Sequence, residues 1–250
     1  MELGETDLDG ILKRQTDAEN SRLDLGLIRY NWKEMLECVA SVHEYSIVHS
    51  DLKPANFLLV GGRLKLIDFG IAGTIQENTI NVHRENQVGT PNYMAPEALL
   101  DSNISVCMPK SGSKLVKVGK PSDVWSLACI LYLMVYGTQP FGHVQGVVRK
   151  VMAITDSHHV ISYPSMGKNG SEVPETCKNT LKACLAWDQD LRPTTESLLD
   201  RSNRFLYPDQ IDEDKVGLNL DSLTVVVQDT IKHCRALEVS TDNEKGEFVI

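Results

Sequence analysis

Apolar side chains recur at helical spacing in the first fifth of the chain and predict an amphipathic helix that ends at about Tyr45. Its apolar face consists of Trp32, Met35, Leu36, Val39 and Val42. The run from Trp125 to Tyr136 is almost wholly apolar but too short to cross a bilayer, so it predicts a core helix. Pro121 suits the first turn of that helix. Three shorter helices are expected near residues 143–155, 174–187 and 194–205.

A short segment after the first helix has the pattern of a β-hairpin. Two runs, 57–60 and 63–67, flank the pair Gly61-Gly62, which suits a tight turn. The polar run His49–Asn56 contains a proline and precedes the hairpin, and Asp68 follows it. We therefore expect a loop, a hairpin and a carboxylate in immediate succession.

Two stretches lack periodicity and are expected to be long surface loops. The first spans about 74–92, and the second, 101–120, is basic and rich in Ser and Gly. A solvated insertion is the preferred interpretation of the second loop, and a phosphate- or partner-binding patch is the alternative. His158-His159 is likewise expected to lie in a solvated loop, because no Cys, His or Asp cluster accompanies it as a metal site would require.

Composition and charge narrow the class of protein. The chain has 250 residues, 42% of them hydrophobic, which is enough for one substantial core. A net charge of −9 argues against a surface devoted to nucleic acid or to an anionic membrane. The segment from Pro208 to Ile250 holds ten acids and four bases, so it is expected to be an acidic extension. One apolar helical face is expected within it, formed by Leu220, Leu223, Val227, Ile231 and Cys234.

The cysteines and the N-terminal residues indicate a compartment. The six cysteines form no C-x-x-C pair and are expected to be buried thiols in a reducing environment. The acidic first residues contain no apolar stretch of signal-peptide type. A cytoplasmic or nuclear protein is the expectation.

Four polar residues in and after the loop suit phosphoryl transfer, a reaction that needs positioning, metal ions and cations more than covalent help. Asp51 could accept or orient the proton of a substrate hydroxyl, and Lys53 could neutralise the transferred phosphate. Asn56 offers an amide oxygen and Asp68 a carboxylate to Mg²⁺, a hard ion that prefers oxygen ligands.

The order of the motifs is more specific than any one of them. The sequence contains D-x-K-x-x-N, a hairpin, D-F-G, then Ala95-Pro96-Glu97 and Asp123-x-Trp125. With these motifs the chain resembles a eukaryotic protein kinase from the hinge onwards, over about residues 1–206. The resemblance implies a protein-kinase-like fold, namely a mainly α-helical C-terminal lobe with a small β-hairpin and with the N-terminal lobe absent from this chain. It implies a kinase domain over 1–207 and an acidic C-terminal extension over 208–250.

The resemblance also assigns roles to individual residues. Glu2 and Gly4 match the hinge that holds adenine, and Leu58 and Ile67 match apolar residues beneath the nucleotide, so ATP is the expected cofactor beside Mg²⁺. Structural roles are implied for a second set: Glu97 pairing with Arg192, and Asp123 bracing the catalytic loop through backbone hydrogen bonds. The run Gly89-Thr90-Pro91-Asn92-Tyr93 resembles the peptide-positioning loop of Ser/Thr kinases, with Thr90 contacting Asp51 and Lys53.

Finer motifs resemble the TTK-type monopolar spindle kinases. These are V-H-S-D-L-K-P-A-N-F-L, L-K-L-I-D-F-G-I-A, Q-V-G-T-x-N-Y-M-x-P-E-A and a Lys/Ser-rich insertion before P-x-S-D-V-W-S-L. Lys53 is typical of Ser/Thr kinases, and the subfamily is classed as dual-specificity, so protein substrates with Ser or Thr, and with Tyr left open, are implied. Kinetochore and spindle-checkpoint partners in nucleus and cytoplasm are implied as well, with no direct nucleic-acid binding and no membrane. Ser50 replaces the arginine that usually grips an activation-loop phosphate, and autophosphorylation at Thr79 is a hypothesis.

Alternatives remain open. The Gly-rich loop and strand lysine of a kinase lie upstream of the hinge, so we expect this chain alone to be inactive or very weak. A truncated, catalytically silent lobe that docks substrates or competes with a complete kinase is one alternative function. Another Ser/Thr kinase family, with a coincidental insertion before Pro121, is a second.

Overall fold

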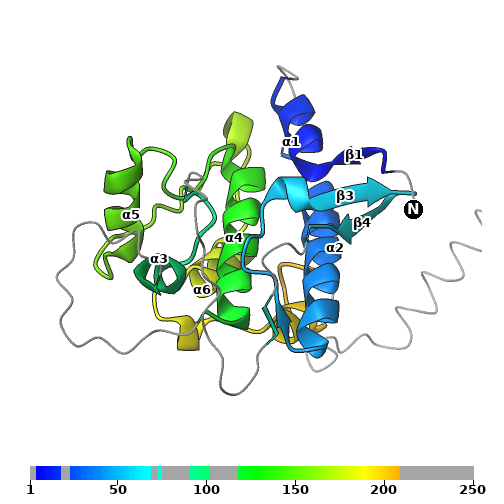
Figure 1. The fold of residues 1–250 in the computed structure, drawn as a ribbon. Coiled ribbons are helices and arrows are strands. Elements are labelled where there is room, and N and C mark those ends of the chain that lie inside the picture. Colours follow the sequence, from blue (N-terminus) through cyan, green and yellow to red (C-terminus); the bar gives the residue numbers. More distant parts are fainter. Residues whose placement is uncertain (1–3, 18–22, 69–72, 75–90, 102–117, 209–250) are drawn as a thin grey trace, which may run out of the picture. The chain divides into compact units, whose positions relative to one another are not determined.

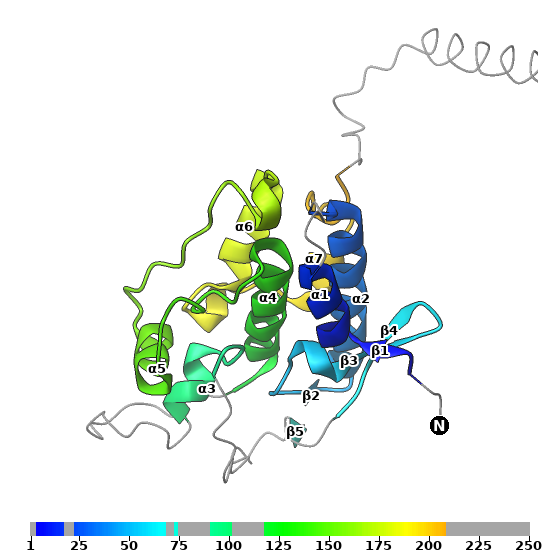
Figure 2. The same cartoon turned by 90° about the horizontal axis from the view of Figure 1, so that it is seen from above.

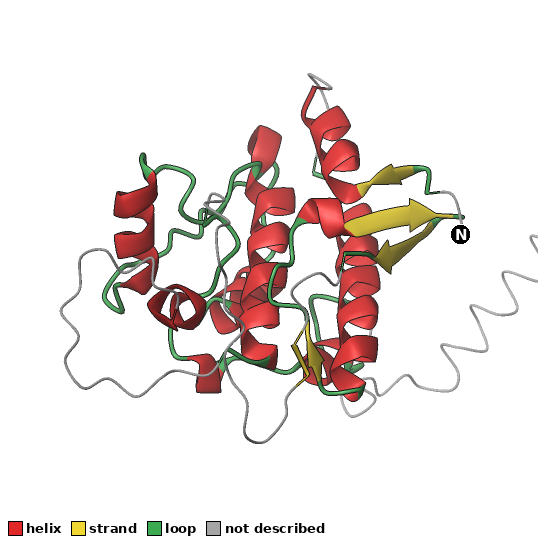
Figure 3. Ribbon diagram, viewed as in Figure 1, coloured by secondary structure: helices red, strands yellow, loops and turns green. Residues whose placement is uncertain are grey.

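The computed structural model describes residues 4–17, 23–68, 73–74, 91–101 and 118–208. These residues form a helix-rich fold with a small antiparallel sheet (Figure 3). The helices are α1 (Leu8–Asp17), α2 (Leu25–Glu44), α3 (Pro96–Asp101), α4 (Lys120–Tyr136), α5 (Val147–Thr155), α6 (Glu175–Cys184) and α7 (Thr195–Leu199). The strands are β1 (Thr6–Asp7), β2 (Ile47–Val48), β3 (Phe57–Val60), β4 (Arg63–Leu66) and β5 (Gly73–Thr74). Short 3₁₀ turns occupy Pro54–Asn56, Lys168–Gly170 and Gln189–Leu191.

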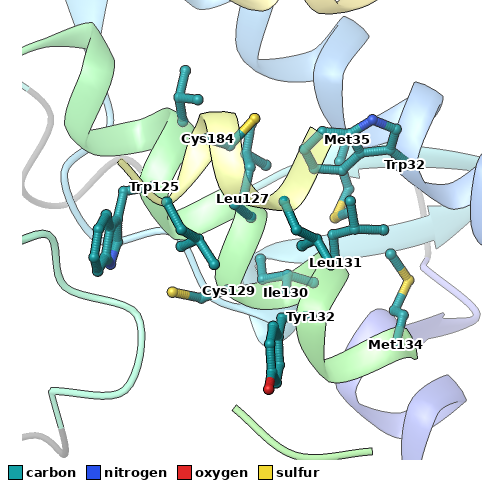
Figure 4. Close-up of a cluster of buried hydrophobic side chains, with 14 of the residues drawn as sticks. Trp32, Met35, Trp125, Leu127, Cys129, Ile130, Leu131, Tyr132, Met134 and Cys184 are labelled. Carbon is teal, nitrogen blue, oxygen red and sulfur yellow. The ribbon is translucent and has the colours of Figure 1, made fainter. Parts of the chain in front are cut away.

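Helices α2 and α4 form the centre of the fold (Figures 1 and 2). Side chains on nearly every face of α4 are buried, which its almost wholly apolar sequence predicts. Helix α2 is amphipathic and places Trp32, Met35 and Leu36 in the same core as Leu127 and Leu131 of α4 (Figure 4). Both predicted core helices are therefore confirmed.

The ends of these two helices follow from local chemistry. Asp24 begins α2 by accepting a hydrogen bond from the Leu27 N–H at 3.0 Å. Gly137 ends α4 at a φ of 73°, a left-handed conformation that glycine adopts without steric strain, and its N–H bonds the Leu133 carbonyl. Helix α2 begins at Leu25, earlier than the predicted apolar face. The prediction missed the first turns because Leu27 and Tyr30 are exposed there, which weakens the amphipathic pattern.

The hairpin is confirmed. Strands β3 and β4 pair antiparallel with Phe57 opposite Leu66, and the turn residues Gly61 and Gly62 have φ values of 56° and 79°. Strand β1, which the sequence did not predict, pairs with β3 and makes a three-stranded sheet of order β1-β3-β4. A second pairing joins β2 to β5.

Several predicted boundaries were wrong, and some elements were missed. Helices α1 and α3 were not predicted, and α5 and α6 are shorter than the patterns suggested. Helix α7 ends at Leu199 rather than near Phe205. The reason is local: the Asn203 side chain accepts the N–H groups of Phe205 and Leu206, both at 3.1 Å, and so replaces the helical hydrogen bonds there.

Some predictions lie outside the described residues and stay untested by the fold. They concern Glu2, Thr79, Thr90, most of the two long loops and the extension beyond residue 208. None of the helices in the part of the chain that the structure describes is long and apolar enough to span a membrane.

Candidate active site

The polar loop between β2 and β3 carries an ion pair at its surface. Lys53 Nζ donates to Asp51 Oδ2 at 3.1 Å, and the two side chains are 41% and 34% exposed. Because both charged ends reach solvent, a ligand can approach either of them. The loop therefore presents a carboxylate and an ammonium side by side.

Asn56 fixes the end of this loop from inside. Asn56 is 2% exposed. Its Oδ1 accepts the backbone N–H of Lys53 at 3.0 Å, and its backbone N–H donates to the Lys53 carbonyl at 2.9 Å. The backbone donor identifies Oδ1 as the oxygen of the amide. Since a carbonyl oxygen has two lone pairs, one remains for a cation.

Asp68 is connected to Asn56 through the backbone. The N–H of Ile67, one residue earlier, donates to the Asn56 carbonyl at 2.8 Å. Asp68 itself has a φ of 64°, in the left-handed region that non-glycine residues seldom adopt. Strain of this kind persists only where the surroundings hold it, and it is commonest at functional sites. Asp68 is exposed, so its carboxylate can reach a ligand.

Of the residues predicted around the nucleotide, Gly4 and Leu58 lie in contact. A Cβ added to Gly4 would overlap the Leu58 side chain, and the next residue, Glu5, donates its N–H to the Leu59 carbonyl at 2.9 Å. Ile67 is 38% exposed directly after β4, as an apolar residue that faces a ligand would be. Glu2 lies outside the described residues.

Asp123 of α4 holds the start of the loop, as predicted. Its Oδ2 accepts the His49 N–H at 2.9 Å and its Oδ1 accepts the Ser50 N–H at 2.8 Å. Ser50 has a φ of 66°, which turns its N–H toward the carboxylate. His43 of α2 adds a third contact, because its Nε2 lies 2.8 Å from Oδ2. The sequence did not lead us to predict this contact of His43. The available signal was its position on the buried face of an amphipathic helix, where a polar side chain needs a partner.

The predicted pair between Glu97 and Arg192 is also confirmed. Arg192 Nη1 and Nη2 donate to the two oxygens of Glu97 at 2.7 and 2.9 Å, with both side chains almost fully buried. Ser122 Oγ donates to the same carboxylate at 2.7 Å. Arg192 also lies over the Trp125 ring at 4.9 Å and donates to the carbonyls of Pro121, Ala186 and Trp187. This pair joins α3 to the end of the 3₁₀ turn Gln189–Leu191, and its burial leaves it no access to a ligand.

Side chains from α2 and from the segment before β1 hold the hairpin that connects Asn56 to Asp68. Glu34 of α2 is buried and accepts the Leu64 N–H at 3.0 Å and Arg63 Nε at 2.8 Å. Glu5 accepts the Gly61 N–H at 3.0 Å, and Tyr30 donates to the Gly62 carbonyl. Sequence reasoning missed these supports, since each is a contact between distant segments that no local pattern reports.

A second polar region lies at residues 91–93, the described part of the run 89–93 that resembles a peptide-positioning loop. Ser126 Oγ donates to the Tyr93 carbonyl at 2.7 Å, and Lys150 Nζ donates to Asn92 Oδ1 at 2.7 Å. Burial raises the pKa of the Tyr93 phenol, so this ring stays neutral. The segment is therefore held from both α4 and α5.

The donor set fits Mg²⁺ better than a transition metal. Within the described ranges no group of three or more His, Cys, Asp or Glu residues could hold an ion by itself. Asn56 and Asp68 offer two hard oxygen ligands on segments that the Asn56–Ile67 hydrogen bond joins. Magnesium typically binds one or two protein oxygens together with substrate phosphates and waters.

A cavity of about 330 Å³ lies elsewhere, between the ends of α5 and α6. Its walls include Trp125, Phe141, Tyr163 and Trp187. None of the four predicted catalytic and metal-binding residues lines it. It is therefore separate from the site built around Asp51.

Comparison with known proteins gives a consistent result. The family model for the protein kinase domain matches residues 1–203. The serine/threonine-protein kinase mph1 of Schizosaccharomyces pombe is 47% identical over 80% of this chain and 30% of its own length. MPS1 of Saccharomyces cerevisiae is 46% identical over 83% of this chain and 27% of its own, and the dual specificity protein kinase TTK of Mus musculus is 42% identical over 80% and 22%. The chain spans less than a third of the length of these relatives.

Proposed function

The chain belongs to the protein kinase family, with Mps1 and TTK kinases among its relatives, and from this membership we propose that it transfers the γ-phosphoryl group of ATP to Ser and Thr hydroxyls of proteins. Dual specificity, with transfer to Tyr as well, follows the printed name of the mouse relative.

One observation carries this proposal. Asn56 bonds the Lys53 backbone on one side and the Ile67 backbone on the other, so that it joins the Asp51–Lys53 ion pair to the residue that precedes Asp68. Phosphoryl transfer depends on such fixed positioning more than on covalent chemistry. Asp123 also holds the start of this loop, because its carboxylate accepts the backbone N–H groups of His49 and Ser50.

The chemistry of each residue suggests its role. Asp51 would accept the hydroxyl proton of the substrate, and Lys53, whose Nζ lies 3.1 Å from Asp51 Oδ2, would balance negative charge on the transferred group. Asn56 and Asp68 would hold Mg²⁺, which bridges phosphate oxygens and neutralises their charge when it is bound. Gly4, Leu58 and Ile67, with Glu2, would contact the adenine end of the nucleotide.

We further propose that residues 1–207 are the hinge and C-terminal lobe of the kinase domain, with 208–250 as an acidic extension. The helix-rich fold with its small antiparallel sheets supports that assignment. None of the comparisons supports the alternative of a silent docking module.

Substrates and location are proposed from the resemblance to the monopolar spindle kinases. The substrates would be kinetochore and spindle-checkpoint proteins. The protein would occur in nucleus and cytoplasm and gather on the spindle during mitosis, without binding nucleic acid or membrane directly.

The experiment follows labelled phosphate from ATP–Mg²⁺ to a generic Ser/Thr protein substrate during long incubations. It compares the wild-type chain with Asp51→Asn and with Asp190→Asn, a matched control at an exposed position. We expect transfer by the wild type and the control and only background labelling by Asp51→Asn. Equal labelling by the wild type and Asp51→Asn would contradict the assigned role of Asp51.

A further inference from the structure

The cavity between the ends of α5 and α6 has walls that other parts of the fold hold in place. Four aromatic rings form much of its surface, those of Trp125, Phe141, Tyr163 and Trp187. The loop that carries Tyr163 is tied to α4 at two points. Tyr132 donates its hydroxyl to the Ser162 carbonyl at 2.8 Å, and Tyr136 donates its hydroxyl to the Pro164 carbonyl at 3.1 Å. A volume of about 330 Å³ is enough for a small organic molecule, and fixed walls lower the cost of binding one.

Part of the apolar wall reaches solvent. Trp187 is 41% exposed and Val160 is 86% exposed, and both line the cavity. Single exposed apolar residues are ordinary on a protein surface, but here two of them border a hollow with aromatic walls. A ligand with an apolar body would therefore remove apolar surface from water when it enters the cavity.

The cavity also has a cation in its wall. Lys182 of α6 lines it, and Lys182 Nζ lies 6.0 Å from the centre of the Tyr163 ring. Its carboxylate partner, Glu175, is 3.5 Å from Lys182 Nζ but only 2.6 Å from Lys178 Nζ. Glu175 is thus held mainly by Lys178. Since an ammonium group has three donors, Lys182 can bind a further anion.

The charges around the cavity favour an anion over a cation. Two of the four rings already face a cation, because Arg192 lies over the Trp125 ring at 4.9 Å and Lys182 lies over Tyr163. A cationic ligand would meet like charges at both rings. The acidic residue of the wall, Asp156, is exposed, and its Oδ1 accepts the His158 N–H at 3.0 Å within its own loop.

We propose that this cavity binds a small carboxylic acid with an aromatic body, whose ring lies among the four aromatic side chains and whose carboxylate pairs with Lys182. The site goes beyond the proposed kinase function, because none of the residues assigned to phosphoryl transfer lines the cavity. Burial raises the pKa of the Tyr163 phenol, so that ring stays neutral and does not repel the acid.

The test uses three probes with the same phenylpropyl body: 3-phenylpropionate, its neutral amide and the corresponding amine. The full chain is labelled with ¹⁵N, and its three tryptophans give three indole N–H signals in an NMR titration. We expect 3-phenylpropionate to shift the signals of Trp125 and Trp187 and to leave that of Trp32 in place. Trp32 does not line the cavity, and Figure 4 shows it on the opposite side of the core cluster from Trp125. A Trp187→Phe variant assigns one of the signals.

The dissociation constants test the charge. We expect the acid to bind about fivefold more tightly than the amide, as for a partly exposed ion pair, and the amine to bind most weakly. Lys182→Met should remove the difference between acid and amide and leave the affinity for the amide unchanged. Lys33→Met, at an exposed position on α2, should keep the difference.

Several outcomes would overturn the inference. They are unshifted signals of Trp125 and Trp187, equal binding of acid and amide by the wild type, tighter binding of the amine, and a preference for the acid that persists in Lys182→Met. The comparison of the three probes needs only the wild-type chain, so it stands even if a variant does not fold. No step of the test uses phosphate transfer, so the cavity site and the proposed function succeed or fail separately.

Discussion

Asp123 and Ser50 are joined by a 2.8 Å hydrogen bond from the Ser50 N–H to Asp123 Oδ1, across a sequence separation of 73 residues. The bond requires the left-handed backbone of Ser50, at a φ of 66°. The residue that follows Ser50 is Asp51, so the conformation of one strained residue sets the direction of the proposed proton acceptor. A carboxylate on the central helix thereby controls the geometry of the loop.

Replacing Asp123 by Asn should destabilise both the fold and the loop. One oxygen becomes an NH₂ group that faces an N–H, and a buried, charge-assisted acceptor is lost. We expect the free energy of unfolding to fall by about 3 kcal/mol. Urea unfolding followed by circular dichroism measures it, with the exposed Asp190→Asn as control. A change below about 0.5 kcal/mol, typical of surface substitutions, would show that Asp123 does not brace the loop.

The Glu97–Arg192 pair should behave as a coupled unit. Arg192→Met leaves a buried carboxylate without its cation, and we expect it to lower the free energy of unfolding by about 4 kcal/mol. In the double variant Glu97→Leu with Arg192→Met the stranded charge is gone, so the loss should be clearly smaller than the sum of the two single losses. A double-mutant cycle measured by urea unfolding tests this, and simple additivity would contradict the coupling.

How far the sequence could predict these features depends on the range of the interactions. The hairpin and α4 were predictable because Gly61-Gly62 and an unbroken apolar run act locally. The Glu97–Arg192 pair was predictable only through the resemblance, since 95 residues separate the partners. The burial of Lys150 was not predictable, because a lysine on an amphipathic helix is ordinarily exposed, whereas Lys150 is 9% exposed and bonds Asn92, which is 58 residues earlier in the chain.

Helix α1 was also missed, in part because its burial depends on residues distant in the sequence. Its sequence is largely polar and contains Gly10, so the pattern there is weak. The helix forms because Asp7 accepts the Gly10 N–H at 2.7 Å and because Leu8 is completely buried in the core. Leu8 directly follows β1, whose pairing with β3 the sequence did not reveal.

Gly4→Ala should weaken nucleotide binding. The added methyl group would overlap Leu58, so one of the two segments must move where the adenine end of ATP is proposed to lie. We expect a loss of about 1–2 kcal/mol in ATP affinity, or roughly five- to thirtyfold in Kd. Binding of a fluorescent ATP analogue measures it. The double variant Gly4→Ala with Leu58→Ala makes room for the methyl group, and it should bind more tightly than Gly4→Ala alone if overlap is the cause.

The last prediction concerns alkaline pH. Burial raises the pKa of Cys177 and of Cys184 to about 12, against an ordinary value near 9. Both groups are neutral when protonated, so the unfolded chain loses their protons first as the pH rises. The stability that the two thiols contribute is therefore complete below pH 9 and decreases between pH 9 and 12, by up to about 1.4 kcal/mol per pH unit for each thiol. Replacing Cys184 by Ala removes one of these titrations. We expect the free energy of unfolding of Cys184→Ala, measured in urea from pH 8 to pH 10.5, to decrease less steeply with pH than that of the wild type, whatever constant offset its small cavity adds. Parallel pH profiles would mean that the Cys184 thiol titrates equally in the folded and unfolded chain, and its burial against α4 would then be wrong.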